Sequence, residues 1–120
     1  MKSELDLLVG TVIDSLVKLD LLLLLHARAG GVQTADEISA QLSRPPHQVT
    51  PALDQLAESG LVERFPLGTG RHVLYGPPED QHMRDLLAQL HDRYRRDPAA
   101  RSDLVRQVMA GREGAEPEQP

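Results

Sequence analysis

The stretch that decides the fold is TADEISAQLSRPPHQVTPALDQLAESGLVERFPLGTGRHVLY, residues 34–75. Thr34 and Glu37 have the spacing of a capping box, in which each side chain satisfies a free amide at a helix start. We therefore predict a short helix over about residues 35–42. The next four residues, SRPP, are predicted to form a turn.

A second helix and a β-hairpin follow in the same stretch. Val49, Leu53 and Leu56 form an apolar stripe with helical spacing, and Gly60 is a typical left-handed stop. Residues 61–65 and 71–75 are strand-like, and the five residues between them contain two glycines, which predicts a hairpin turn. Helix, turn, helix and hairpin in this order predict a winged helix-turn-helix.

The flanking segments are predicted to be helical. Apolar residues step by three or four from Leu5 to Leu23, with a break near Gly10 and a new cap at Ser15. Residues 32–33 allow only a short edge strand. After Pro77-Pro78 a further helix is expected, which Asp97-Pro98 interrupts and restarts.

These signals define a fold class and four segments. The class is mainly α with a small β-hairpin: a winged helix-turn-helix with extra N- and C-terminal helices. The segments are an N-terminal helical arm (1–15), the winged helix-turn-helix core (16–76), C-terminal helices (77–110) and a disordered tail (111–120).

Composition favours one domain without a membrane segment. The chain has 120 residues, 40% of them apolar, which is enough for a single core. It has no cysteine, so disulfides and thiolate metal sites are impossible. The longest apolar run, Leu21 to Leu25, is far too short to span a bilayer and is expected to be a core helix. Glu4 and Asp6 are unlike the basic opening of a secretory signal, so we expect a soluble, cytoplasmic protein.

No pattern in the sequence indicates catalysis or metal binding. The five histidines show no i, i+4 pair and no partner at ligand spacing, so no metal and no cofactor are expected. There is no nucleophile elbow, phosphate loop or paired-carboxylate arrangement. We therefore expect no catalytic residues and no enzyme.

Residues 34–75 resemble the winged-helix domain of bacterial transcription regulators of the MarR type, most clearly in VTPALDQLAESGLVERF, residues 49–65. The resemblance implies a DNA-binding transcription regulator that inserts a recognition helix into the major groove of double-stranded DNA, with a wing along the backbone. It implies a base-reading set consisting of Arg44, His47, Gln48, Thr50 and Gln55. It implies wing contacts from Arg64, Arg71 and His72.

The resemblance also implies a homodimer, because one winged helix meets only a few base pairs. The apolar stripes of the leading arm, Leu5 to Ile13, and of the last helix, Leu104 to Met109, are the candidate dimer surfaces. The alternative is that both stripes fold back on their own core.

Pro51 departs from the family pattern, because proline removes an amide and crowds the carbonyl four residues earlier. Either the recognition helix starts late, with Thr50 as cap and Pro51 first, or it is bent. A late start would withdraw His47 and Gln48 into the turn. Asp54 and Glu58 are also expected to face outward on this helix.

Charge supports a second hypothesis, a winged-helix protein–protein interaction module without significant DNA binding. The net charge of −5 opposes attraction to phosphate, and residues 44–78 hold three bases against three acids. The polar residues of the recognition helix would then be solvated positions, and the basic hairpin residues would only protect an edge strand. The arginines at 93, 95 and 96 are bracketed by Asp92 and Asp97 and are predicted to form a solvated face with local ion pairs.

Overall fold

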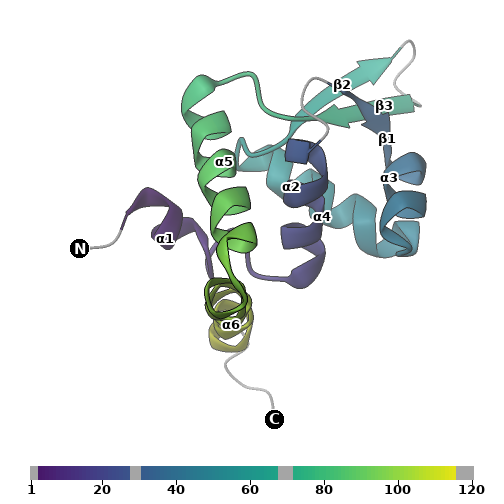
Figure 1. Ribbon diagram of the computed structural model, residues 1–120. Helices are drawn as coiled ribbons and strands as arrows, with labels where there is room; N and C mark the ends of the chain where they lie inside the picture. Colours follow the sequence, from purple (N-terminus) through teal and green to yellow (C-terminus); the bar gives the residue numbers. More distant parts are fainter. Residues whose placement is uncertain (1–2, 28–30, 68–71, 116–120) are drawn as a thin grey trace.

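The computed structural model describes residues 3–27, 31–67 and 72–115, and of residues 67, 72 and 111–115 it describes the backbone alone. The chain is mainly helical, with a small antiparallel sheet of strand order β1-β3-β2 (Figure 1). In chain order the elements are α1 (Glu4–Leu8), α2 (Leu16–Ala27), β1 (Gln33–Thr34), α3 (Ala35–Leu42), α4 (Pro46–Glu58), β2 (Glu63–Leu67), β3 (His72–Gly76), α5 (Gln81–Arg96) and α6 (Pro98–Ala115).

The capping box predicted at the start of α3 is present. The Thr34 hydroxyl accepts a hydrogen bond of 3.1 Å from the Glu37 amide, and the Glu37 carboxylate accepts one of 2.9 Å from the Thr34 amide. At the other end, Ser43 takes the left-handed conformation with φ of 56°. The predicted bounds of this helix, 35–42, are confirmed.

Helix α4 starts at Pro46 and continues through Pro51, so of the two alternatives stated for Pro51 the late start at Thr50 does not occur. Proline suits the first helical position, where its missing amide would have no intrahelical partner, and Pro46 occupies that position. The first turn closes before Pro51, since the Gln48 amide donates to the Pro45 carbonyl at 3.0 Å. His47 and Gln48 therefore belong to the helix.

The hairpin strands are shifted from their predicted positions. β2 begins at Glu63, and Leu61 and Val62, which are 1% and 2% exposed, pack into the core ahead of the strand. In the ladder Arg64 lies opposite Tyr75, and on the far side of β3 Tyr75 lies opposite Gln33 of β1. The short edge strand at 32–33 is thus confirmed at 33–34. Of the turn predicted at 66–70, Pro66 and Leu67 belong to β2, and residues 68–70 lie outside the described residues.

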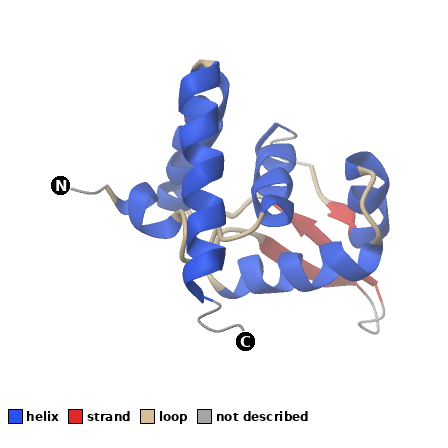
Figure 2. Cartoon of the chain, turned by 90° about the horizontal axis from the view of Figure 1, so that it is seen from below, coloured by secondary structure: helices blue, strands red, loops and turns tan. Residues whose placement is uncertain are grey.

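Leucine side chains of α2 fill the centre of the molecule. Leu19, Leu21, Leu22 and Leu25 are each at most 1% exposed, so this helix is buried on most sides, as predicted. It packs against α4 on one side and α5 on the other. The strands gather at one side of the molecule, and α1 and α6 lie on the opposite side (Figures 1 and 2).

The terminal helices fold back on this core. Leu5 of α1 and Leu104 of α6 are buried within the chain. Both apolar stripes thus pack on their own core, which was the stated alternative to a dimer surface. The predicted break is present, since Gly10 has φ of 97° and the Ser15 hydroxyl accepts from the Lys18 amide at 3.3 Å. α6 continues to Ala115, so its last five residues occupy the start of the stretch predicted as a tail.

The restart at Asp97-Pro98 is also present. The Asp97 carboxylate accepts from the Ala100 amide at 2.7 Å and caps α6. None of the helices in the described ranges is long and apolar enough to cross a membrane.

Candidate functional site

The outward ridge of α4 is acidic. Val49, Leu53 and Leu56 are fully buried. Because a helix has 3.6 residues per turn, the side of α4 opposite these residues faces away from the core, and we call this side the ridge of α4. The ridge consists of His47, Pro51, Asp54 and Glu58, of which all but the half-buried Asp54 are exposed. It holds two carboxylates and neither lysine nor arginine.

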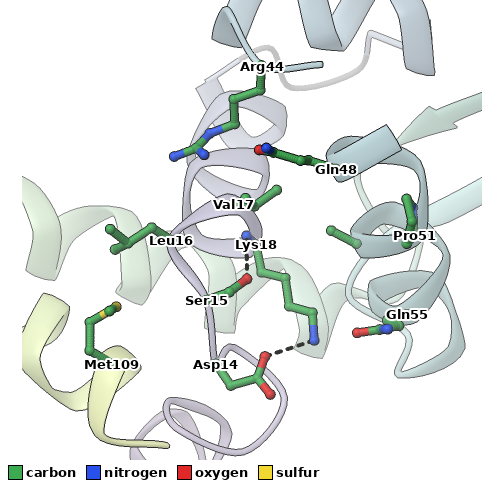
Figure 3. Close-up of a pocket in the computed structure, with 11 residues that line it drawn as sticks. Asp14, Ser15, Leu16, Val17, Lys18, Arg44, Gln48, Pro51, Gln55 and Met109 are labelled. Carbon is green, nitrogen blue, oxygen red and sulfur yellow. Dashed lines mark hydrogen bonds and ion pairs between the residues drawn. The ribbon is translucent and has the colours of Figure 1, made fainter. Parts of the chain in front are cut away.

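The two glutamines of α4 lie on the flank of this ridge, beside a hollow of about 670 Å³. Gln48 and Gln55 border the hollow together with the first turn of α2 and Met109 of α6 (Figure 3). Thr50 lies elsewhere on the helix and is half-buried. The predicted base-reading residues of α4 are thus divided between its ridge and its sides.

A mostly buried ion pair lies in this hollow. Only 11% of the Lys18 side chain is exposed, and its Nζ donates to Asp14 Oδ1 at 2.9 Å. The amide of Gln55 points from α4 toward the Lys18 ammonium (Figure 3). The carboxylate of Asp14 compensates the lysine charge, so the pair adds no net charge to the hollow.

Arg44 joins the turn before α4 to α2. Its Nε and Nη2 both donate to Asp20 Oδ2, at 3.2 and 2.8 Å. Arg44, which the resemblance places in the base-reading set, thus lies just before the first turn of α4, and Asp20 compensates its charge. Nothing in the local sequence indicates this pair, because Asp20 lies in another helix.

Arg64 joins the hairpin to α4. Its Nη1 donates to Asp54 Oδ1 at 2.8 Å, and the Tyr75 hydroxyl donates to the same oxygen at 3.0 Å. Burial, and then the Asp54 carboxylate, raise the pKa of Tyr75, so the phenol stays protonated as the donor. The acidic ridge of α4 and the edge of the hairpin thus form one hydrogen-bonded unit.

The two remaining predicted wing residues are only partly visible. Arg71 lies outside the described residues, and for His72 the structure gives only the backbone position at the start of β3. The exposed side chain of His47 lies on the ridge of α4. Of the eight predicted site residues, the six with described side chains lie on α4 or beside it, and both arginines among them are paired with acids.

The arginine-rich end of α5 forms ion pairs, as predicted, and one of them is not local. Arg96 pairs with Asp92 at 2.8 Å, one helical turn away, whereas Arg93 reaches Asp6 of α1 at 2.9 Å. Hydrogen bonds from the Ser3 amide and then from the Arg93 guanidinium hold the pKa of Asp6 below its ordinary value. These contacts attach the N-terminal arm to α5.

The fold brings two histidines together that are far apart in sequence. The rings of His26 in α2 and His91 in α5 have centroids 4.8 Å apart, tilted by 47°. Burial first, and then His26 and Arg95, lower the pKa of His91. Within the described ranges no group of three or more histidine and acidic side chains could hold a metal ion.

Comparisons of the chain with models of protein families, with curated proteins and with solved structures give no match.

Proposed function

We propose that the protein is a DNA-binding transcription regulator in which α3 and α4 form a helix-turn-helix and the β2–β3 hairpin forms the wing. The observation that carries the proposal is the exposed polar surface of α4, bounded by Arg44 before its first turn and by Arg64 on the hairpin. A helix of this kind enters the major groove while flanking arginines lie along the phosphates.

In this mechanism the first turn of α4 supplies the base contacts. His47 and Gln48 are exposed there, and amide side chains pair with the donor and acceptor edge that adenine presents in the major groove. Gln55 lies two turns further along, and Thr50 is less accessible. Specificity would therefore come mainly from the N-terminal half of the helix.

The ion pairs of both arginines must be exchanged for phosphate contacts. Arg44 and Asp20 have side chains 28% and 36% exposed, and Arg64 and Asp54 are 48% and 40% exposed. Ion pairs at such surfaces contribute only about 0–1 kcal/mol, so exchange costs little. Phosphate contacts also release condensed counterions, which favours the exchange at low salt.

Pairing of two copies stays part of the proposal. The apolar stripes of α1 and α6 pack mainly on their own core, but Leu7 is 59% exposed and Met109 is 36% exposed. Light scattering coupled to gel filtration gives the mass directly, and Leu7→Lys should dissociate a dimer that uses α1. If the wild type is a monomer, the dimer is refuted, and the proposed DNA-binding site is unaffected by that result.

The DNA proposal is tested by salt-dependent binding of a labelled random-sequence duplex. Each lost phosphate contact lowers the slope of log K against log salt by about 0.9, so the Arg44→Gln/Arg64→Gln variant should lose about 1.8. Arg96→Gln is the matched control, because Arg96 is also exposed and ion-paired but belongs to α5. Failure of the wild type to bind at low salt would refute the proposal.

A second candidate function is a protein-interaction module that binds a basic segment of a partner. The acidic ridge favours it, since Asp54 and Glu58 lie on the outward side of α4. Under this candidate a partner's binding falls in an Asp54→Asn/Glu58→Gln variant, whereas Arg44→Gln leaves it unchanged. The DNA mechanism predicts the reverse order, with duplex binding reduced by Arg44→Gln and increased by loss of the ridge acids.

A further inference from the structure

The histidine pair between α2 and α5 is a feature that DNA binding does not use. His26 lies in the last turn of α2, and His91 lies in the second half of α5. Their ring centroids are 4.8 Å apart, although the two residues are separated by most of the domain. The pair is therefore a product of the fold, and an unfolded chain does not hold the rings together.

The structure shows no partner for the ring nitrogens of either histidine among the described residues. Each histidine is half-buried, and neither ring forms a hydrogen bond with another residue in the part of the chain that the structure describes. A hollow of about 300 Å³ adjoins His91 and is bordered by Asp92, Arg95 and Arg96 of the same helix, so the ion must lie on the side of the His91 ring that faces His26.

The chemistry of the pair suits a borderline transition metal ion. Imidazole is a common ligand of zinc, copper and nickel, and bonds of about 2.0–2.1 Å place two such nitrogens on either side of one ion. The last torsion of a histidine side chain has broad minima, so the rings can turn their nitrogens toward a common point. At a pH slightly above 7 an imidazole is mostly neutral and able to coordinate.

We propose that His26 and His91 bind one divalent first-row transition ion, such as Zn²⁺ or Ni²⁺, with water in its other coordination positions. The ion links the end of α2 to α5. Because α2 packs on both α4 and α5, the link braces the helix that supports the proposed recognition helix. Neither histidine is among the proposed DNA contacts, so the metal site can be tested separately from DNA binding.

The experiment is thermal unfolding of the untagged full chain with increasing NiCl₂. An ion that binds the folded state alone, at 100 times its Kd, raises the ratio of folded to unfolded protein about 100-fold. The Tm should rise with nickel in the wild type, and most of that rise should vanish in His26→Gln and in His91→Gln. The double variant should lose little more than either single variant, because one ring alone cannot chelate.

Two matched controls locate the site. His47 and His82 are exposed and lie on other surfaces of the chain, so His47→Gln and His82→Gln should keep the full nickel-dependent rise in Tm. His91→Cys should keep a rise with Zn²⁺, since thiolate and imidazole together are typical zinc ligands. A rise that survives in both His26→Gln and His91→Gln, or one that is lost in either control, would overturn the proposal.

A measurement on the wild type keeps the test valid if a variant fails to fold. Paramagnetic Ni²⁺ broadens the amide signals closest to it, and the first signals lost should be those around His26 and His91. Titration calorimetry should give one ion per chain. Absence of any nickel-dependent change in Tm or in the spectra would overturn the site.

Discussion

Replacing Asp54 with Asn should strengthen DNA binding at almost no cost in stability. One oxygen of this carboxylate accepts from the Arg64 guanidinium at 2.8 Å and from the Tyr75 hydroxyl at 3.0 Å. Asparagine keeps an oxygen acceptor for Tyr75 and removes the negative charge from the ridge of α4. Arg64 is then free to contact a phosphate without giving up a charged partner.

The exposure of the pair sets the magnitudes. With side chains 48% and 40% exposed, the ion pair contributes about 0.2–1 kcal/mol, so the Tm should fall by a few degrees at most. The same free energy no longer opposes transfer of Arg64 to DNA, which corresponds to an affinity gain of up to about fivefold. Arg64→Gln, in contrast, removes a phosphate contact and should cost about eightfold at 0.1 M salt.

Fluorescence anisotropy of a labelled duplex between about 50 and 200 mM KCl separates these effects. Asp54→Asn should raise the affinity and leave the salt slope unchanged, whereas Arg64→Gln should lower both. Asp92→Asn is the control, because it makes the same charge change and frees Arg96 on α5. If Asp54→Asn and Asp92→Asn raised the affinity equally, only net charge would matter, and the reasoning about α4 would be wrong.

Three further substitutions test the fold and its attachments. Leu53→Ala should destabilise the protein by about 2.7–5 kcal/mol in urea unfolding, because Leu53 is fully buried; a loss typical of a surface residue would contradict this packing. Pro51→Ala should raise the stability, by up to about 3 kcal/mol, since it restores an amide inside α4; unchanged or lower stability would argue against Pro51 within the helix. Asp6→Asn should destabilise the protein at neutral pH. Hydrogen bonds from Ser3 and Arg93 hold the folded pKa of Asp6 below its ordinary value, so its contribution to stability is full above the unfolded pKa and is lost as pH falls through the folded pKa. Urea unfolding at neutral and acidic pH should show the wild-type advantage disappearing toward acid, and an advantage independent of pH would exclude the Arg93 contact as its source.

Local signals were sufficient to predict most helix boundaries. The capping box at Thr34 and the cap at Ser15 each depend on residues within one turn, and both are present. The start of β2 was missed because an apolar pair, Leu61 and Val62, has the same pattern in a strand as in a buried connection. Whether such a pair becomes a strand or a buried connection depends on the helices packed around it, and the local sequence does not contain that information.

The start of α4 shows the same limit. Both Pro46 and Pro51 suit a first helical position, so proline chemistry alone favours neither. The longer helix places Val49 and Leu53 together in the core, each fully buried. Burial of these side chains offsets the amide that Pro51 lacks, and packing rather than propensity decides where the helix begins.

The predicted site residues gather around α4, but their electrostatic partners could not be predicted. Lys18 and Asp14 lie one helical turn apart, and that spacing is a local signal for an ion pair. Arg44 and Asp20, like His26 and His91, meet only through packing of separate helices. Their contacts follow from tertiary structure, which the periodicity of either segment does not encode.

The two arginines beside α4 are not equivalent, because their acidic partners lie in different places. Asp20 belongs to α2, so when Arg44 moves to a phosphate the carboxylate left behind is off the ridge of α4. Asp54 belongs to the ridge itself, so when Arg64 moves, a bare carboxylate remains facing the DNA. Repulsion between the Asp54 carboxylate and the phosphates opposes binding, and it arises only when Arg64 leaves its partner. Arg44 should therefore provide the larger share of the affinity, while the pair of Arg64 and Asp54 decides whether this surface prefers a phosphate backbone or a basic protein segment.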